Sequence, residues 1–319
     1  MTFTVREATP ADKSEVIALI EEMIPGVDVK ARWRWMYETN PGGPALTWMA
    51  IAESGDVAGC TSFFPFRLWL DGSPVRAALG GDGYVRPAFR RRGLGGLLHD
   101  ASRQAMPSHD IGCMYGAPGA MNVTPLKHGG SRELGHVARY VRPLRVGPLP
   151  IAFPSSLTLA PMLPMDARID AVWNEAREDL QLAAIRDAAF YEWRFRTAPA
   201  QKEPAYVILD GGTPVAACAL ESLRGGEELH IVDLVAVRGA WHAALSAIAH
   251  HAVAHTRAKT ASIKLFANDG RKRHMWRAGF LERESKPFLC MIPPDGDRRF
   301  IDPQRWFYTG GDADLDTLE

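Results

Sequence analysis

Arg90-Arg91-Arg92-Gly93-Leu94-Gly95-Gly96 lies between a strand-like run, Gly83-Tyr84-Val85, and a run whose leucines and alanines recur at helical spacing up to Ala105. A strand, a glycine-bearing turn and a helix N-terminus leave several backbone N–H groups without an intrahelical partner, at the positive end of the helix dipole. With the arginines beside them, these groups predict a site for the phosphates of a ligand. The alternative is a basic turn that only caps an ordinary helix.

Spacing excludes two common phosphate motifs. No lysine follows these glycines, as a P-loop requires, and Leu98 stands where a dinucleotide fingerprint requires its third glycine. The acyl-CoA signature Arg/Gln-x-x-Gly-x-Gly/Ala does fit, as residues 90–95. With Val85-Arg86-Pro87 ahead of it and Leu97-Leu98 behind it, the segment resembles motif A of the GNAT superfamily of N-acetyltransferases.

The first 145 residues contain the elements of one complete domain of that superfamily. Val5 to Asp12 resembles its first strand and helix start, and Thr9 with Asp12 predicts a capping box. An apolar stripe from Val16 to Met23 then indicates a helix. The other predicted strands are Leu46 to Ala52, Val57 to Leu70, Ile111 to Tyr115 and His136 to Val141, and a helix is predicted at Gly119 to His128.

The rest of the chain repeats this pattern. Trp35 and Trp193 have the same offset as Cys60 and Cys218, 158 residues (193 − 35 and 218 − 60). We therefore predict an α+β fold of two tandem GNAT-like domains, residues 1–145 and 146–319, each a mixed, mostly antiparallel sheet flanked by helices. The proline-rich residues 142–165 are predicted to form a packed, mostly extended crossover.

The second copy lacks the glycine-rich turn. Its counterpart is Val237-Arg238-Gly239-Ala240-Trp241-His242-Ala243, with one glycine and a bulky tryptophan at the expected helix start. We expect acyl-CoA to bind the first half only. The second half is then expected to support the architecture, to complete an acceptor pocket or to form a homodimer.

Composition narrows the classes of partner. The chain of 319 residues has 37 basic and 37 acidic residues and no net charge, which argues against nucleic acid or an anionic membrane as a partner. The N-terminus does not resemble a signal peptide, and no apolar stretch reaches the ~18 residues of a spanning helix. We expect a cytoplasmic protein. The four cysteines lack CxxC spacing, which favours reduced core thiols over a metal site.

The resemblance implies an acetyltransferase that uses acetyl-CoA as co-substrate, needs no metal, and acts on the amine of a small molecule or an amino sugar. In that family a bulged strand opens just before the motif, so Tyr84 and Val85 would pair with the pantetheine and supply an N–H for the developing oxyanion. Asn122 matches the family's pantetheine-contacting asparagine. The phosphates would lie on the motif itself, formed by Arg90, Arg91, Arg92, Gly93, Leu94, Gly95 and Gly96.

The catalytic acid and base are less directly indicated. Asp82, on the same strand, is the candidate base, although a structural role is equally compatible because Asp233 recurs in the repeat that lacks the motif. Pro125 occupies the slot of the family's acid tyrosine, so Tyr115 is the candidate substitute. The alternatives are an acyl-CoA sensor without activity, or a transferase for a protein or carrier-bound acceptor.

Overall fold

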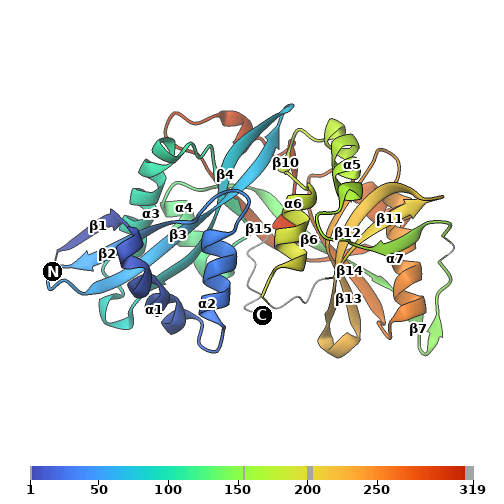
Figure 1. The fold of residues 1–319 in the computed structure, drawn as a ribbon, viewed down its shortest axis with the longest axis horizontal. Helices are drawn as coiled ribbons and strands as arrows, with labels where there is room; N and C mark the ends of the chain where they lie inside the picture. The colour runs from blue at the N-terminus through green and yellow to red at the C-terminus, as the bar shows by residue number, and fades with distance from the viewer. Residues whose placement is uncertain (1, 154, 200–203, 313–319) are drawn as a thin grey trace.

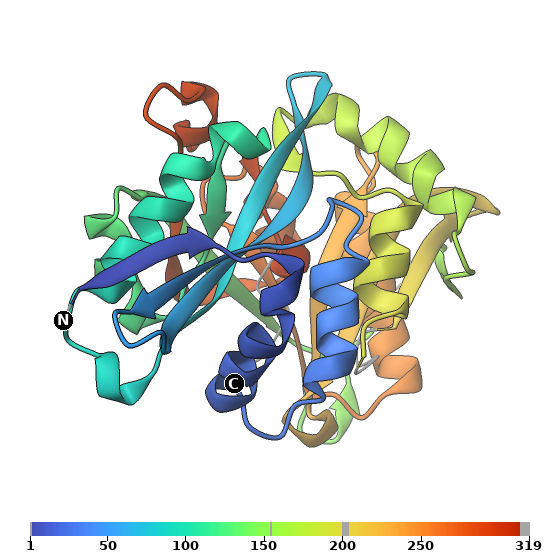
Figure 2. The same ribbon diagram turned by 60° about the vertical axis from the view of Figure 1, so that its left-hand side comes forward.

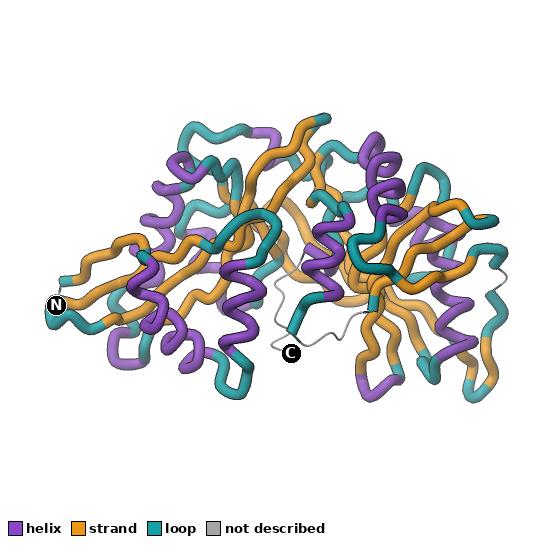
Figure 3. Tube along the Cα trace, viewed as in Figure 1, coloured by secondary structure: helices purple, strands orange, loops and turns teal. Residues whose placement is uncertain are grey.

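A single twisted β-sheet runs through the whole molecule, with helices packed on both of its faces (Figure 1 and Figure 3). The computed structural model describes residues 2–153, 155–199 and 204–312. Fourteen strands of these residues belong to the large sheet, and two short ones, β7 (Arg145–Val146) and β8 (Leu149–Pro150), form a separate hairpin. The α+β class predicted from the sequence is confirmed.

The first half supplies six strands and four helices to this arrangement. The strands are β1 (Phe3–Glu7), β2 (Leu46–Ala52), β3 (Val57–Leu70), β4 (Ser73–Val85), β5 (Met114–Gly116) and β6 (Arg132–Pro143). The helices are α1 (Lys13–Met23), α2 (Val29–Arg32), α3 (Leu94–Ala105) and α4 (Ala120–His128). A 3₁₀ turn precedes α1, and its predicted capping box is present, with Asp12 accepting the backbone N–H of Thr9 at 2.7 Å.

The second half repeats the series with shorter connections. Its strands are β9 (Thr158–Pro161), β10 (Leu182–Ala184), β11 (Ala205–Asp210), β12 (Thr213–Leu223), β13 (Glu228–Ala236), β14 (Thr260–Phe266), β15 (Leu281–Met291) and β16 (Trp306–Phe307). Its helices are α5 (Ala167–Ala176), α6 (Ala188–Tyr191), α7 (Trp241–His255) and α8 (Lys272–Arg277). The crossover of residues 142–165 is mostly extended, and its buried Leu144 and Phe153 pack into the core.

The two halves exchange strands. The strand order is β1-β2-β3-β4-β5-β15-β6-β14-β13-β12-β11-β9, so β15 of the second half lies between β5 and β6 of the first. Likewise, β6 lies between β15 and β14 and is antiparallel to both. This order differs from the expected pair of separate sheets, because each half is completed by a strand of the other. A domain boundary near residue 145 stays a prediction, since the sheet continues across it without a break.

The internal repeat also appears in the helices. A π-helical segment follows α2 (η2, Trp33–Glu38) and another follows α6 (η6, Glu192–Arg196). The two helical pairs lie side by side at the junction of the halves (Figure 1 and Figure 2). Thr39 and Thr197, one residue beyond each segment, both donate a side-chain hydrogen bond to the preceding tryptophan carbonyl at 3.2 Å.

Two clusters of buried side chains lie on opposite faces of the first-half sheet. The larger cluster runs through both halves and contains Leu79 and Tyr115. The smaller cluster contains Ala78 and lies under α3, where Leu94 and Leu98 are buried. These two leucines fix the start of α3 against the sheet at the end of β4. No helix in the described residues is long and apolar enough to cross a membrane.

Candidate functional site

Strand β4 separates from its neighbour halfway along its length. It pairs with β5 in parallel only at Ala78–Met114 and Leu79–Tyr115. Farther along, the register against β3 shifts between Cys60 and Ser62, and Asp82 has a left-handed φ of 51°. Beyond Leu79, no described strand pairs with β4 on its β5 side, so the backbone from residue 80 to residue 85 offers an open edge. Tyr84 and Val85 lie on this edge and are half-buried.

The turn after β4 places a helix N-terminus beside that edge. Arg91 and Gly93 have φ values of 62° and 77°, and α3 begins at Leu94. Gly93 has the left-handed conformation that glycine adopts without strain. A Cβ built on Gly93, Gly95 or Gly96 would meet no described atom within 4 Å, and all three glycines are exposed. The unpaired N–H groups of the first turn are therefore accessible to an anion.

The three arginines surround this turn. Arg90 donates from Nε to the Val85 carbonyl at 2.9 Å, and its guanidinium lies 5.7 Å from the centre of the Tyr84 ring. Arg92 donates to the Ala88 carbonyl at 3.4 Å. All three arginines, including Arg91, are exposed. Their positive charge adds to that of the helix N-terminus, which favours a phosphorylated ligand.

Asp82, the predicted base, is held in a buried ion pair. Arg32 donates to both of its carboxylate oxygens, at 2.6 and 2.8 Å, and the Tyr37 hydroxyl donates at 2.5 Å. The Asp82 side chain is only 4% exposed. Burial, with the adjacent carboxylate, raises the pKa of Tyr37 well above its usual range, which keeps this hydroxyl a donor. This arrangement favours a structural role for Asp82, and its action as a base stays a prediction.

The second half contains the same arrangement. Arg186 donates from Nε to both oxygens of Asp233, at 3.1 and 3.2 Å, and the Tyr191 hydroxyl donates at 2.8 Å. Both partners of the Arg186–Asp233 ion pair are fully buried. An arginine–aspartate–tyrosine network that occurs in both halves belongs to the architecture of the repeat, because only one half has the glycine-rich turn.

Tyr115, the predicted acid, lies deep in the core. Its hydroxyl is buried and has no hydrogen-bond partner among the described residues. The ring packs 5.0 Å from Trp306 and 6.4 Å from Phe288, and burial raises its pKa well above the usual range. It belongs to the larger cluster, on the face of the sheet opposite α3. The structure therefore does not bring Tyr115 to the α3 N-terminus, and its role as acid stays a prediction.

Asn122 lies on the exposed side of α4, the helix that packs next to α3. Pro125, in the slot of the expected tyrosine, is inside the same helix. The sequence reasoning missed Arg32. The sequence alone does not single it out, because Arg32 is buried whereas Arg34, close by in the same helical segment, is exposed.

Comparisons with solved structures identify the fold. A GCN5-related N-acetyltransferase from Anabaena variabilis matches with a TM-score of 0.69 and 17% identity, over 91% of this chain and 73% of that chain. An Enterococcus faecalis protein described as a probable N-acyltransferase matches with a TM-score of 0.70 and 14% identity, over 92% and 73%. The N-myristoyltransferase of Saccharomyces cerevisiae, solved with bound myristoyl-CoA, matches with a TM-score of 0.57 and 11% identity, over 95% and 87%.

No protein-family model and no curated protein matched the sequence. The chain has the fold of the GCN5-related N-acetyltransferases, as the glycine-rich motif predicted. It consists of two tandem GNAT-like halves joined in one sheet.

Proposed function

We propose that this protein is an acyltransferase that moves an acetyl group from acetyl-CoA to the amine of a small molecule or an amino sugar. The observation that supports this most strongly is the open edge of β4 leading into the exposed N-terminus of α3, with Gly93 and Arg90 at the turn. The edge suits an extended pantetheine arm with amide groups, and the turn suits the pyrophosphate. The likeness to acyl-CoA-dependent transferases agrees with this donor.

In the proposed reaction, the acceptor nitrogen attacks the thioester carbonyl of acetyl-CoA directly. A C–N bond forms, the C–S bond breaks, and the CoA thiolate leaves while the amine loses a proton. Neighbouring N–H groups of a strand point to opposite sides, and the Arg86 N–H donates toward β3. The Val85 N–H is therefore the one that would face the open edge and stabilise the oxyanion, while Tyr84 lies beside it. Arg90, Arg91 and Arg92 hold the phosphates and thereby fix the position of the thioester.

Neither predicted acid–base residue is free to take the proton that the amine loses. Asp82 would need to leave its ion pair with Arg32 to act as a base, and the Tyr115 hydroxyl lies in an apolar cluster. A CoA thiolate is a good leaving group that needs little protonation. We therefore propose that water carries the amine proton, with Asp82→Asn as the variant that tests the alternative.

One second candidate is an acyl-CoA sensor without transferase activity. The observation that favours it is Pro125 within α4, where the resemblance predicts a tyrosine. A third candidate, transfer to a protein or carrier-bound amine, uses the same donor site and differs only in the acceptor. Dimer formation by the second half stays a prediction.

The experiment that separates these candidates is the release of free thiol from acetyl-CoA in the presence of a panel of amines, amino sugars and peptides. A transferase of small molecules predicts thiol release that depends on one class of small amine. Release only with peptides would assign a protein acceptor. If acetyl-CoA binds saturably but no acceptor of the panel raises thiol release above the rate of spontaneous hydrolysis, the protein is assigned as a sensor.

A further inference from the structure

The last described residues return into the sheet of the second half. Strands β13 and β14 pair in parallel from Glu228–Thr260 to Ile231–Ile263 and then separate. This separation corresponds to the opening between β4 and β5 in the first half, because β13 and β14 occupy the equivalent places in the repeat. The first opening has an exposed strand edge. The second is filled by residues 308–312, which follow β16.

Backbone contacts tie this segment to both walls of the opening. On the β14 side, Thr309 forms an antiparallel bridge with Leu265, and the Phe266 N–H donates to the Tyr308 carbonyl at 3.1 Å. On the β13 side, a Cβ built on Gly310 would lie 2.7 Å from the Val232 carbonyl oxygen. Only glycine permits so close an approach, so the segment is fitted to this place.

Polar side chains anchor the segment at the buried aspartate of the repeat. The Thr309 hydroxyl donates to Asp233 and accepts from Arg186, whose Nη2 lies 3.0 Å away. Arg186 also forms an ion pair with Asp312. All four residues are buried, with exposed fractions of 0–1%. Arg186 therefore has carboxylates from two sides, one from β13 and one from the segment itself.

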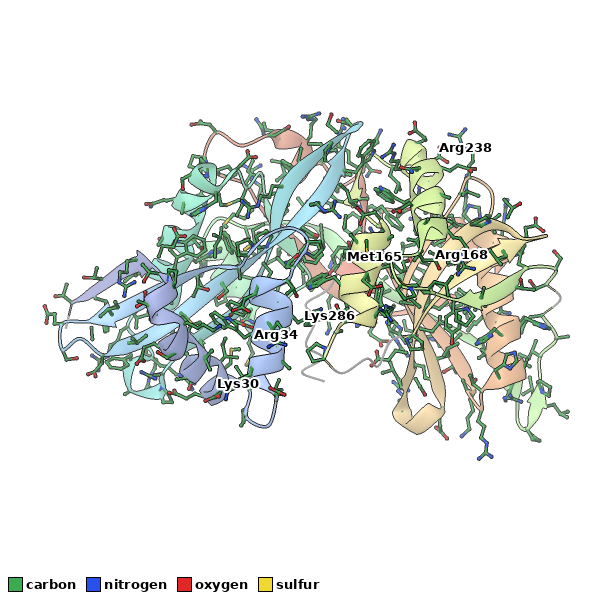
Figure 4. All side chains as sticks on the ribbon, viewed as in Figure 1. Lys30, Arg34, Met165, Arg168, Arg238 and Lys286 are labelled. Carbon is green, nitrogen blue, oxygen red and sulfur yellow. The ribbon has the colours of Figure 1, made fainter. Side chains whose placement is uncertain are left out.

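The site equivalent to the phosphate turn offers less positive charge than the turn of the first half. A surface cavity of about 490 Å³ lies at the start of α7, lined by Arg238, Trp241, Asp269 and Arg271 among others. Arg238 pairs with Asp179 and Arg271 with Asp269. Figure 4 shows Arg238 at the surface beside α5. Two of the three arginines in this lining, Arg238 and Arg271, are thus neutralised by aspartates of the chain, which leaves Arg273 as the main source of positive charge for a phosphate.

We propose that residues 308–312 are a built-in occupant of the second half's cofactor cleft and take the place that acyl-CoA takes in the first half. This inference rests on the proposed donor site for its comparison of the two halves. The segment supplies the backbone partners and the polar contacts that a pantetheine arm would otherwise supply. The cleft of the second half thus stays closed to acyl-CoA, whether or not the first half has bound it.

Site-resolved amide hydrogen exchange on the full chain tests this proposal without any ligand. The Phe266 N–H, which donates to the Tyr308 carbonyl, should exchange at least roughly 10³-fold more slowly than an unprotected amide, because residues 308–312 must leave the cleft before this N–H can meet water. Saturating acetyl-CoA should leave this rate unchanged and should slow exchange at residues 83–85. Fast exchange at the Phe266 N–H would overturn the proposal that residues 308–312 fill the second cleft. Unchanged exchange at residues 83–85 would instead overturn the proposed donor site.

Full-length variants make the test specific. Thr309→Val removes the hydroxyl between Arg186 and Asp233 and should speed exchange at Phe266 by about 5- to 150-fold. Thr197→Val is the matched control, because the Thr197 hydroxyl bonds the Trp193 carbonyl outside the cleft. This variant should leave the exchange rate of the Phe266 N–H unchanged. Equal acceleration by both variants would overturn the proposal.

Should Thr309→Val fail to fold, Asp312→Asn provides the same readout, because Arg186 keeps its pairing with Asp233. It should likewise speed exchange at Phe266 more than Thr197→Val does. A second bound acetyl-CoA per wild-type chain would also contradict a filled second cleft.

Discussion

Trp35 and Trp193 hold each other across the junction of the two halves. The indole N–H of each donates to the backbone carbonyl of the other, at 2.8 and 2.9 Å, and the rings stack at 5.3 Å between their centres. Reciprocal contact between equivalent residues is the signature of two-fold symmetry. The approximate two-fold axis that relates the halves therefore passes between these tryptophans, and their hydrogen bonds lock the halves together.

Trp35→Phe should lower the free energy of unfolding by ~0.5–1.5 kcal/mol, because the Trp193 carbonyl loses its indole donor and keeps the Thr197 hydroxyl. Urea denaturation measures this loss. Trp33→Phe is the control, since the Trp33 indole bonds the exposed Glu38 instead. An equal loss in both variants would show that the reciprocal pair has no special role.

Asp82→Asn should destabilise the fold by ~3–5 kcal/mol, because it removes the carboxylate charge from a buried ion pair with Arg32. Asp233→Asn in the other half should cost less urea stability, because Arg186 keeps Asp312 as a second carboxylate partner. If Asp82 serves only the architecture, the folded variant should keep kcat within about tenfold of wild type. A fall of about 10²–10⁴-fold with unchanged acetyl-CoA affinity would instead identify Asp82 as the base.

Tyr115→Phe should leave stability unchanged or raise it by ~1 kcal/mol. The hydroxyl is buried with no hydrogen-bond partner among the described residues, so its removal relieves a desolvation cost. Thermal unfolding measures stability, and thiol release measures turnover, which should also be retained. Loss of turnover in a stable Tyr115→Phe protein would show that this hydroxyl is the acid after all.

His230 should make stability dependent on pH. Burial lowers its pKa from 6.5 to about 3, while its Nδ1 lies 2.8 Å from the Ser262 hydroxyl. Between these values the unfolded state binds the extra proton, so the free energy of unfolding falls as the pH falls below 6.5. The slope for this one group is at most ~1.4 kcal/mol per pH unit.

Urea midpoints at pH 7, 6 and 5 check this prediction. The stability gap between wild type and His230→Gln should narrow as the pH falls, because the glutamine variant cannot take up the proton. His128→Gln, at an exposed position on α4, is the control and should run parallel to wild type. Parallel curves for His230→Gln as well would contradict the assignment.

Much of the fold was predictable because its signals are local. The bounds of β2 and β3 agree with the apolar runs Leu46 to Ala52 and Val57 to Leu70, and α3 begins where Gly93 ends the turn. The strand exchange was not predictable. Alternation of apolar residues in β6 and β15 shows which faces are buried, but it contains no information about which strands pair.

The candidate site, like the fold, was predictable where its signals are local and not where distant segments meet. The glycine-rich turn is a contiguous stretch, so its geometry could be predicted from the residues alone. The ion pair of Asp82 depends on Arg32, 50 residues earlier in the chain, which α2 brings under the sheet. The burial of Tyr115 depends on Trp306, which comes from the far end of the sequence. Contacts of this range require the assembled tertiary structure.

Calorimetric titration with acetyl-CoA, comparing wild type with Gly95→Gln, tests the central claim most directly. Gly95 is exposed near the start of α3, and a Cβ there would meet no described atom, so the variant should fold. A glutamine at this position would occupy the space above the turn. Gly270→Gln is the control, because Gly270 is equally open but lies away from this turn. We predict one site per wild-type chain and at least tenfold weaker binding, or ~1.4 kcal/mol, for Gly95→Gln alone. Two sites per chain, or unchanged affinity in Gly95→Gln, would contradict a single donor site at this turn.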